Sequence, residues 1–599
     1  MIDYRIEVGS THSHRFHVTL RIAKPLPQQR LSLPTWIPGS YLVREFARHL
    51  SPISAQQGAR SLPVQQLDKA TWLIEATGKG DLVIRYEVYA FDTSVRAAYL
   101  DSRRGFFNGT SVFLCAQGFE DQPHAVKITG LPKGWSVASS LAAIKVNAQG
   151  IGDYQAPSYD ELVDHPVELG TFWRGQFTAK GVAHELVVSG ASADFDGQRL
   201  LDDTKRLCEA QITFWHGRRK PAFNRYVFLL NVVEDGYGGL EHRNSTALIC
   251  ARRDLPRTGR TVNAEGYQTL LGLISHEYFH TWNVKRLKPA EFAPYDYSQE
   301  NYTRLLWFFE GFTSYYDDQF LLRTGLIDAN AYLKLLAKTV NQVHSTPGRH
   351  SYSVAQSSFD AWTRYYRPDE NTANATVSYY TKGSLVALGL DLSLRQLPLN
   401  TAGQQPSLDG VMLRLWQLNR PIQESDIAQA LEAEAGQPPL MAGAWSWGSL
   451  LELWVHGTDD LPLQHLLGTY GVTWVSKPAS LTQRLGLRLS ESAGAIKVQA
   501  VMRHSVAETT GLSAGDELIA LGGWRLRRSD DLALWHDDQH DQPLLVCRDQ
   551  AIMTLTLPAQ AAAKAKPRPA GATGDVVGLT LSERPDEAGA QRRRSWLKT

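Results

Sequence analysis

The spacing of apolar residues changes near residue 194 and divides the chain into parts with different secondary structure. From Tyr4 to about Thr178, short segments alternate apolar and polar side chains between Pro- and Gly-containing turns, which is typical of antiparallel strands. Apolar residues then recur at helical spacing, in stretches near 196–216, 264–286, 301–323, 328–344 and 377–396. After about Ser476, short strands are expected again. The sequence therefore predicts a multidomain α+β protein with an amino-terminal β domain and a mainly helical middle part.

The composition is that of an ordinary folded protein with several domains. At roughly 150 residues per domain, the 599 residues suffice for three or four domains. Hydrophobic residues make up 43% and charged residues 21%, which excludes a disordered or collagen-like chain. With 62 basic and 61 acidic side chains the net charge is +1, so no overall field attracts nucleic acid or an anionic membrane. We expect neither as a partner.

The cysteines and the amino-terminal residues indicate a reduced compartment. The cysteines are Cys115, Cys208, Cys250 and Cys547. They lie far apart without a C-x-x-C pair, so neither a disulfide framework nor a thiolate zinc site is indicated. The first residues lack the pattern of a secretory signal, and no apolar run approaches the ~18 residues that a membrane span needs. These features predict a cytoplasmic protein.

A His-Glu-x-x-His motif in the middle of the chain indicates a metal site. His276 and His280 are four residues apart, so on a helix they share one face and their imidazoles can reach one metal ion. Glu277 would lie beside that ion, where a carboxylate can take a proton from water. The alternative is a pair of histidines in the core or on the surface. The metal that this motif predicts is zinc.

A catalytic zinc site with two histidines needs a third protein ligand, and Glu310 is the candidate. Twenty-nine residues, 281–309, separate it from His280, and its own segment is otherwise apolar. A carboxylate in such a segment is costly to bury unless a cation neutralises it. The alternative is an exposed glutamate on an amphipathic helix. We therefore predict one zinc ion per chain, held by His276, His280 and Glu310.

Further segments extend this motif into a resemblance to a known family. Residues 238–242, Gly-Gly-Leu-Glu-His, resemble a strand of the zinc aminopeptidases, and residues 380–383, Tyr-Thr-Lys-Gly, resemble their Tyr-x-Lys-Gly. The early segment 36–46 and the late segment 511–516, Gly-Leu-Ser-Ala-Gly-Asp, narrow the match. Together with the zinc motif, they make the chain resemble the glycyl aminopeptidase family of gluzincin metallopeptidases. The resemblance covers nearly everything up to residue 558.

The resemblance implies three domains. An amino-terminal β domain would comprise residues 1–178, and a thermolysin-like, mainly helical zinc catalytic domain would comprise residues 179–475. A carboxy-terminal PDZ-like domain would follow over residues 476–558. Residues 559–599 would be a linker or tail, because the stretch from Ala561 to Ala572 is rich in Ala, Lys and Pro.

The resemblance also implies a role for each residue around the zinc ion, and side-chain chemistry agrees with it. Glu277 would be the general base toward water and would pass the proton to the leaving amine. The phenol of Tyr380 would donate to the oxyanion that forms during attack. For Tyr380 and its neighbour Tyr379, packing in the core is the alternative. Asp317, seven residues after Glu310, could reach the site from the same helix face, although a solvated face is the more ordinary interpretation.

An exopeptidase must recognise a free amino terminus, and Glu241 is the candidate for this role. A carboxylate on an exposed strand edge accepts a charge-assisted hydrogen bond while the neighbouring backbone pairs with the substrate. Gly238 and Gly239 would allow a close approach, because a side chain there would fill the space that the substrate needs. The alternative is a Gly-rich turn with a solvated glutamate. No role is assigned to His242.

These features predict a zinc aminopeptidase that acts on peptides with a free amino terminus. A preference for small residues such as Gly and Ala is implied by the resemblance alone. Two alternatives stay open: a zinc endopeptidase in which Glu241 is structural, and a peptide-binding adaptor in which the PDZ-like domain acts and the catalytic centre is vestigial. The PDZ-like domain, with residues 484–489 as the candidate strand and loop, would bind a peptide carboxy terminus or only brace the catalytic domain.

Overall fold

The computed structural model describes residues 2–260, 264–400, 403–436, 444–559 and 575–597. The chain divides into two compact units. The first comprises Met1–Asn301, Tyr316–Leu326 and Asn419–Ile422, and the second comprises Tyr302–Tyr315, Ile327–Leu418 and Gln423–Thr599. None of the helices in the described ranges combines the length and the apolar character that crossing a bilayer requires.

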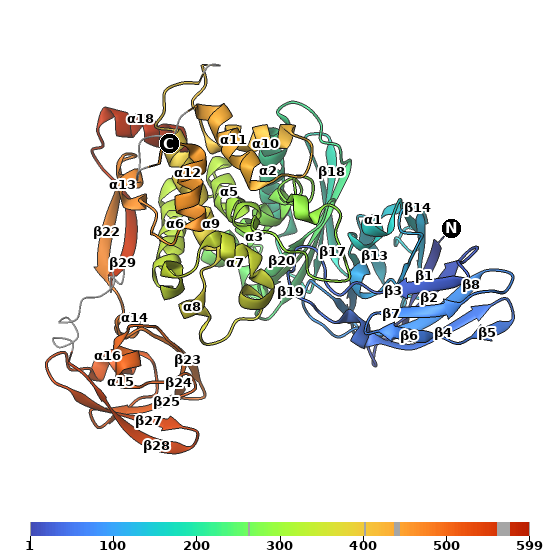
Figure 1. Cartoon of the computed structure of the whole chain (residues 1–599), viewed down its shortest axis with the longest axis horizontal. Helices are drawn as coiled ribbons and strands as arrows, with labels where there is room; N and C mark the ends of the chain where they lie inside the picture. Colours follow the sequence, from blue (N-terminus) through green and yellow to red (C-terminus); the bar gives the residue numbers. More distant parts are fainter. Residues whose placement is uncertain (1, 261–263, 401–402, 437–443, 560–574, 598–599) are drawn as a thin grey trace. The chain divides into compact units, whose positions relative to one another are not determined.

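The first unit begins with a large, mainly antiparallel sheet, drawn in blue in Figure 1. In spatial order its strands are β14 (Ala142–Val146), β15 (Gly152–Ala156), β12 (His124–Thr129), β1 (Ile2–Ser10), β2 (Arg15–Ile22), β8 (Leu82–Tyr89), β4 (Leu50–Gln57) and β5 (Arg60–Leu62). The expected alternation is present, since Ile2, Tyr4 and Ile6 of β1 are buried while the residues between them are more exposed. The prediction of an amino-terminal β domain is therefore confirmed.

Two smaller sheets complete this β region. One contains β13 (Ser136–Ser139), β16 (Val167–Gly170), β10 (Arg104–Phe107) and β9 (Ala98–Leu100). The other contains β11 (Cys115–Ala116), β3 (Gln28–Ser32), β7 (Thr71–Glu75) and β6 (Gln65–Asp68). A short helix, α1 (Tyr159–Val163), precedes β16 and begins at Ser158, whose side chain accepts a hydrogen bond from the amide of Glu161.

A five-stranded sheet follows, where the sequence predicted mainly helices. Its spatial order is β17 (Trp173–Ala179), β18 (Val182–Ser189), β19 (Arg225–Val233), β21 (Ser245–Ala251) and β20 (Gly238–Glu241). The expected boundary at residue 178 falls inside β17, which pairs with β18. β18, β19 and β21 are parallel and almost fully buried, so their sequences lack the alternation that reveals a half-exposed strand. β20 pairs antiparallel with β21 at the edge of this sheet.

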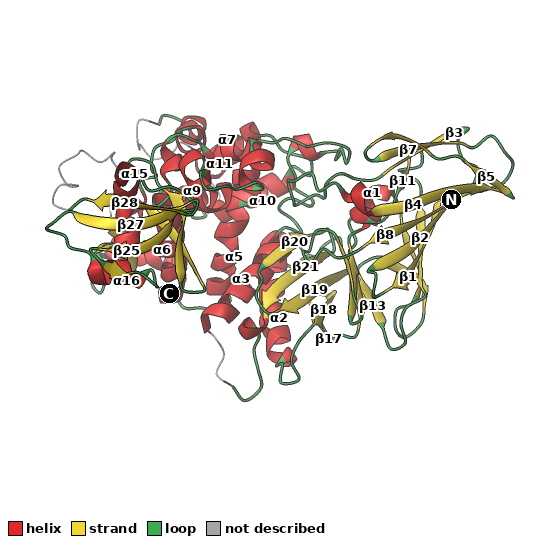
Figure 2. Ribbon diagram, turned by 90° about the horizontal axis from the view of Figure 1, so that it is seen from below, coloured by secondary structure: helices red, strands yellow, loops and turns green. Residues whose placement is uncertain are grey.

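Two helices pack against this sheet. α2 (Gly197–His216) contacts β17, and α3 (Ala264–Phe279) contacts both β20 and β21 as well as α2 (Figure 2). The prediction of a helix near 264–286 is thus correct for its first part, but α3 ends at Phe279. The metal motif consequently lies at the carboxy-terminal end of a helix that is held against the edge strand.

The second unit is mainly helical. Its helices include α4 (Leu306–Phe309), α6 (Ala329–His344), α7 (Val354–Phe359), α8 (Thr372–Ala375), α9 (Tyr379–Leu394), α10 (Leu408–Gln417), α11 (Glu424–Ala435), α12 (Trp447–Leu451) and α13 (Leu463–Gly468). α5 (Gly311–Arg323) begins in this unit and continues into the first. A Cβ atom on Gly311 would lie 2.6 Å from the Gly383 backbone, so the start of α5 and the start of α9 touch through two glycines.

The carboxy-terminal region folds as strands with a separate apolar core. Its sheet contains β23 (Leu487–Ser492), β24 (Ala495–Val501), β25 (Glu517–Leu521), β27 (Gln542–Arg548) and β28 (Ala551–Leu557), with β26 (Trp524–Arg525) paired to β25. Three short helices, α14 (Leu481–Leu485), α15 (Val506–Thr510) and α16 (Asp530–Trp535), add side chains to the core. The return to short strands after residue 476 is confirmed.

The segment predicted as a linker or tail contains regular structure. The Ala-, Lys- and Pro-rich stretch from Ala561 to Ala572 lies outside the described residues, but β29 (Asp575–Leu581) pairs with β22 (Val472–Pro478), as Figure 1 shows. The chain then forms α18 (Glu587–Leu597), whose Trp596 is 1% exposed and packs on Tyr332 and Tyr470. The carboxy-terminal residues therefore pack back on the helical part, so residues 481–557 are inserted between two paired strands.

Candidate active site

The end of α3 presents the three residues of the metal motif. The amide of His280 still donates to the carbonyl of His276 at 3.3 Å, but His280 itself follows the last helical residue. Its Nδ1 lies 2.8 Å from the carbonyl oxygen of Asn283, and only an N–H can satisfy that oxygen. The neutral His280 ring therefore carries its lone pair on Nε2, the atom that a metal would bind.

His276 is held in the same tautomer as His280, but by a different partner. Its Nδ1 lies 2.9 Å from Oδ2 of Asp317, which projects from α5. A carboxylate beside one ring nitrogen fixes the tautomer and makes the other nitrogen a better ligand. Asp317 therefore lies at the metal motif. The more ordinary expectation from the sequence was that it lies on a solvated helix face. Asp317 is one of the residues that position the site.

The two imidazoles face one another through their ligand atoms. Nε2 of His276 and Nε2 of His280 are 3.1 Å apart. With both Nδ1 atoms acting as donors, two lone pairs point at each other, which is unfavourable unless a cation lies between them. This arrangement fits a metal ion.

Glu310 adds a third candidate ligand to the two histidines. One ligand atom from each of His276, His280 and Glu310 lies within 4.8 Å of the others. Glu310 is 2% exposed and connects α4 to α5, and its carbonyl accepts from the amide of Ser314 at 2.8 Å. Glu310 and Asp317 therefore lie on one nearly continuous helical run. Two imidazoles and one carboxylate are the ligands of a catalytic zinc site, so the residues fit that ion.

The opposite face of α3 anchors the motif to the sheet. Tyr278 is fully buried, and its hydroxyl donates to Nε2 of His184 on β18 at 2.8 Å. Nδ1 of His184 donates to the carbonyl of Val182 at 2.9 Å, and burial lowers the pKa of His184 to about 4. His184 is therefore a neutral structural histidine that orients the helix.

Glu277 lies directly against the edge strand. A Cβ atom on Gly239 would lie 2.2 Å from Oε1 of Glu277, so only glycine leaves this carboxylate in place. Glu277 is 5% exposed, on the same helix end as His276 and His280. β20 therefore lies against the metal motif, and the structure gives Gly239 a reason that the sequence did not predict, the contact with Glu277.

Glu241 lies two residues further along β20 and meets the amino-terminal region. It is 4% exposed, and a Cβ atom on Gly39 would lie 2.3 Å from its Oε2. Gly39 has a φ of +92°, a conformation that favours glycine. The segment around Gly39 contributes to the family resemblance, but its place in the site could not be predicted, because no local pattern reveals a contact across some 200 residues.

Tyr380 stands among other tyrosines at the start of α9. Its ring lies 5.4 Å from that of Tyr365 and 4.8 Å from that of Tyr379. Burial and the nearby Glu310 carboxylate raise the pKa of Tyr380 well above its usual value, so the phenol keeps its proton and can donate it in a hydrogen bond. Tyr379 is 0% exposed, as expected for a packing role. Tyr365, which was not among the predicted site residues, ends a π-helical turn, Ala361–Tyr365.

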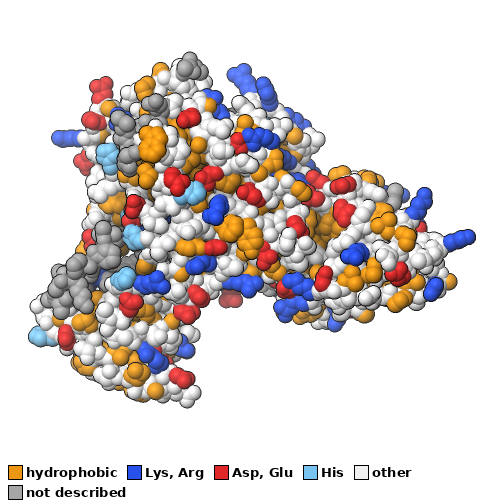
Figure 3. All heavy atoms as spheres, viewed as in Figure 1, with side chains coloured by type: hydrophobic (Ala, Val, Ile, Leu, Met, Phe, Trp, Pro, Cys, Tyr) orange, Lys and Arg blue, Asp and Glu red, His pale blue; other side chains and the backbone are white. Residues whose placement is uncertain are grey.

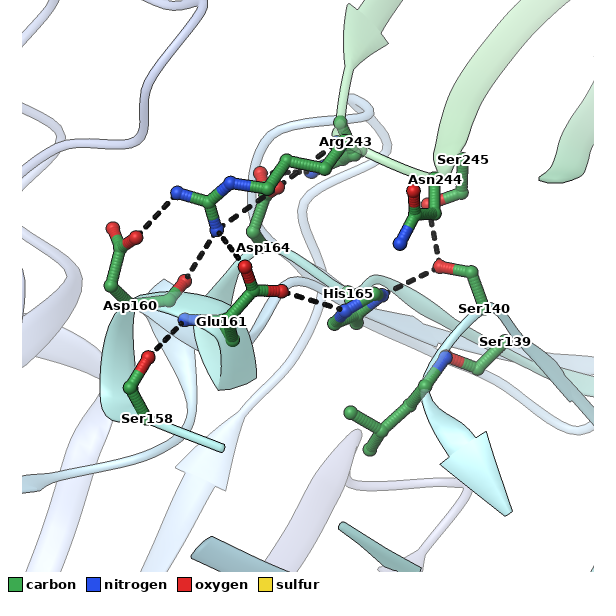
Figure 4. A network of polar contacts seen from close by, with 12 residues as sticks. Ser139, Ser140, Ser158, Asp160, Glu161, Asp164, His165, Arg243, Asn244 and Ser245 are labelled. Carbon is green, nitrogen blue, oxygen red and sulfur yellow. Dashed lines mark hydrogen bonds and ion pairs between the residues drawn. The ribbon is translucent and has the colours of Figure 1, made fainter. Parts of the chain in front are cut away.

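A buried polar network supports the turn after β20 (Figure 4). Oδ1 of Asp164 accepts from Lys285 Nζ at 2.8 Å and lies 3.1 Å from His242 Nδ1, while its Oδ2 accepts from the Arg243 amide at 3.0 Å. Burial would raise the pKa of Asp164, but Lys285 and Arg243 hold it well below its usual value. The amide of Lys285 donates to the carbonyl of His280. Asp164 thus connects the segment after the metal motif with the segment after Glu241.

The same network explains His242, to which the sequence assigned no role. Figure 4 shows the Arg243 side chain directed toward Asp160 and Glu161 of α1, with its Nη1 3.3 Å from Glu161. His165, also next to α1, shares a 2.7 Å hydrogen bond with Ser140. His242 is 0% exposed within this network, so it supports the strand that carries Glu241.

Neither positive nor negative side chains dominate the face of the molecule in Figure 3. On the face drawn there, basic and acidic side chains are interspersed over the described residues. This agrees with the net charge of +1. Recognition by this protein therefore depends on local groups and not on an overall field.

Two family models match the chain. The model described as the Peptidase M61 N-terminal domain matches residues 3–171, and the model described as M61 glycyl aminopeptidase matches residues 269–386. His276, Glu277, His280, Glu310 and Tyr380 all lie within the second match.

Solved structures are also similar to the chain. The crystal structure of an aminopeptidase N family protein from Idiomarina loihiensis is 34% identical with a TM-score of 0.89, and the match covers 100% of both chains. An M1 zinc metallopeptidase from Deinococcus radiodurans is 15% identical with a TM-score of 0.45, covering 77% of this chain and 94% of that one. No curated protein matches the chain.

Proposed function

The chain belongs to the M61 glycyl aminopeptidase family, and we propose that it is a zinc-dependent aminopeptidase that removes amino-terminal residues from peptides. The observation that carries the proposal is the facing pair of imidazole Nε2 atoms, 3.1 Å apart, with the Glu310 carboxylate in the same ligand group. Glu277 and Glu241 lie on the helix end and the edge strand beside this group. Both are buried, as residues that act away from bulk water would be.

The proposed zinc ion, one per chain, would be held by His276, His280 and Glu310. When bound, zinc supplies Lewis acidity that polarises the scissile carbonyl and makes water more acidic. Asp317 and the carbonyl of Asn283 keep the two rings in the ligand tautomer.

The proton transfers fall to Glu277. Its carboxylate accepts a proton from water as the water oxygen attacks the scissile carbonyl carbon, and it delivers that proton to the departing amine nitrogen. The carbonyl oxygen gains negative charge during attack, and the protonated phenol of Tyr380 donates a hydrogen bond to it. Tyr365 stacks on Tyr380 and limits the positions of that ring.

Recognition of the free amino terminus falls to Glu241. Its carboxylate accepts hydrogen bonds from the substrate ammonium, while the backbone of Gly238 and Gly239 pairs with the peptide. The approach of Gly39 to the Glu241 carboxylate supports a preference for small first residues such as Gly and Ala, because it limits the room beside the ammonium.

We propose the domain assignment together with the activity: an amino-terminal β domain, a thermolysin-like catalytic domain and a PDZ-like domain over residues 476–558. The separate core of the strands β23–β28 supports an independent carboxy-terminal domain, which would bind a peptide carboxy terminus or brace its neighbour. A cytoplasmic location is part of the proposal, supported by four cysteines that are all thiols, three of them buried.

A pair of peptides that differ only at the amino terminus tests the proposal. The full-length protein loaded with zinc should release Gly from a Gly-initiated peptide and leave the acetylated peptide intact. A chelator should stop the release, and added zinc should restore it. Cleavage of both peptides at an internal bond would contradict the aminopeptidase and indicate the endopeptidase, in which Glu241 is structural.

A further inference from the structure

An arginine of the amino-terminal β region reaches the strand that would bind the substrate. Arg96 lies in the connection between β8 and β9, and its Nη2 donates to the carbonyl of Gly239 at 3.5 Å. Its Nη1 is 4.0 Å from the place that a Cβ atom of Gly238 would occupy. The guanidinium therefore lies against the first two residues of β20.

This guanidinium is only partly satisfied. Arginine has five N–H donors in a planar fork, and the buried Nε of Arg96 has no hydrogen-bond partner in the described structure. No carboxylate of the described residues forms an ion pair with Arg96, and its one side-chain hydrogen bond, to Gly239, is long. An acceptor oxygen brought to this half-buried guanidinium would therefore find N–H donors that the protein itself leaves unused.

The order of groups along β20 indicates where that partner comes from. Glu241 lies at one end of the strand, Gly239 touches Glu277 in the middle, and Arg96 lies beside Gly238 at the other end. A substrate that runs antiparallel to β20 with its ammonium at Glu241 has its first peptide bond between Glu241 and Gly239, on the side of Glu277, and its next residue near Arg96.

The spacing fits a very short peptide. Residues of a strand rise about 3.4 Å each, so Glu241 and Gly239 are separated by about 7 Å along β20. An extended dipeptide has about the same length between its ammonium and its carboxylate. Its carboxylate therefore comes opposite Gly239, the residue whose carbonyl accepts from Arg96 Nη2. The planar fork of a guanidinium matches a carboxylate in a bidentate pair.

We propose that Arg96 binds a carboxylate immediately downstream of the scissile bond, so that dipeptides with a free carboxy terminus are preferred substrates. This inference rests on the aminopeptidase function proposed above. Tyr237, whose side chain is 65% exposed next to Gly238, would border the same subsite. An Asp or Glu side chain at the second residue of the substrate would supply the same group, a carboxylate, in place of the carboxy terminus.

Matched dipeptides test the proposal on the full-length, zinc-loaded protein. The kcat/KM for Gly-Gly should exceed that for Gly-Gly amide by about 10- to 100-fold, the usual effect of a charge-assisted hydrogen-bond pair. Gly-Asp amide against Gly-Asn amide tests the side chain as the source. A preference in either pair supports a carboxylate subsite and identifies its source, whereas equal rates in both pairs overturn the proposal.

Variants separate recognition from support of the strand. Arg96→Gln should bring kcat/KM for Gly-Gly close to that for Gly-Gly amide, and the fall for Gly-Gly should exceed any fall for Gly-p-nitroanilide. Arg96→Lys should keep part of the preference. Arg103→Gln, at a side chain that is 87% exposed, is the matched control. It should change neither the preference for the carboxylate nor the hydrolysis of Gly-p-nitroanilide.

Two results would overturn the inference in different ways. If Arg96→Gln lowers kcat/KM equally for the acid, the amide and the nitroanilide, Arg96 only supports β20 and the carboxylate subsite is wrong. If the wild-type protein cleaves no Gly-initiated substrate at all while retaining zinc, the aminopeptidase function itself is wrong, and the inference falls with it.

Discussion

The proposed catalytic centre around α3 and the carboxy-terminal strand region of residues 481–557 both bury carboxylates, but the groups around these carboxylates differ. In residues 481–557, all of which the structure describes, Asp516 is the one buried carboxylate. Its oxygens accept from two nitrogens of Arg548 at 2.8 Å and from the Ser513 amide at 2.8 Å. Around α3, Glu310 instead joins two imidazoles, and no second group of this kind occurs among the described residues.

The difference teaches which observation indicates function. A buried carboxylate is common when its own region supplies the cation, and Asp516 with Arg548 is a structural pair of that type. At the proposed catalytic centre the side chains that converge are the candidate metal ligands, the candidate general base and a strand-edge carboxylate, and further residues orient them. The composition of the group and the orientation of its members distinguish a site from a structural pair.

The largest predicted effect comes from removing the general base. Glu277→Gln keeps the shape of the side chain but cannot accept a proton, so kcat on Gly-p-nitroanilide should fall by about 10³-fold. Zinc content should stay at the wild-type level, because Glu277 is not a ligand. Glu265→Gln, at an exposed position on the same helix, is the control and should leave kcat unchanged. Normal turnover of the Glu277→Gln protein would contradict the role of Glu277 as general base, and with it the contrast between this centre and the structural pair of Asp516 and Arg548.

A smaller effect is expected at the strand edge. Glu241→Gln should lower kcat/KM for Gly-initiated substrates by roughly 10- to 100-fold, mainly through KM, because a charge-assisted hydrogen bond to the ammonium is lost. Steady-state kinetics against the exposed control Glu234→Gln measure this. An unchanged KM would make Glu241 structural, like Asp516.

Removing the partner of a ligand should act on the metal. Asp317→Asn should weaken zinc binding by about tenfold or more, because His276 loses the carboxylate that orients its ring. Competition with a chelator measures the change, and excess zinc should restore most of the turnover. If affinity is unaffected, Asp317 does not position His276.

The smallest effect on catalysis is expected from the structural pair. Burial would raise the pKa of Asp516, but the hydrogen bonds from Arg548 and the Ser513 amide lower it below its usual value. Its stabilisation is therefore complete above the unfolded-state pKa and is lost as the pH falls through the lower, folded-state value.

Asp516→Asn should reduce the stability of this region by about 1–2 kcal/mol at pH 7 and by less at low pH. Thermal unfolding as a function of pH measures both changes. Hydrolysis of Gly-p-nitroanilide should stay unchanged. A loss of turnover without a loss of stability would mean that the carboxy-terminal region takes part in catalysis.

Much of the helical part and most ligand candidates could be predicted from the sequence. The helices expected near 196–216, 328–344 and 377–396 are present as α2, α6 and α9, because helical periodicity is a local property. His276 and His280 are four residues apart on a helix end, so their shared face follows from geometry alone. The expected helix near 264–286 ends early at Phe279, and the amides of Thr281 and Trp282 then bond to carbonyls three residues back instead of four.

The rest could not be predicted, because it depends on contacts between distant segments. Gly39 touches Glu241, and Asp164 binds Lys285, across more than 100 residues in each case. The buried strand β19 contains a continuous apolar run from Tyr226 to Leu230, which does not differ locally from a buried helix. Arg96 looks like an ordinary surface arginine in the sequence, and only its place beside Gly239 indicates the role that we propose for it.

The central claim is that His276, His280 and Glu310 together hold one zinc ion that activity requires, and elemental analysis tests it most directly. Zinc content and Gly-p-nitroanilide hydrolysis should be measured on the same samples of wild-type and Glu310→Gln protein. We predict one zinc per chain with chelator-sensitive turnover in the wild type, and loss of both in the variant. Equal zinc content in the two proteins, or wild-type turnover without zinc, would contradict the account.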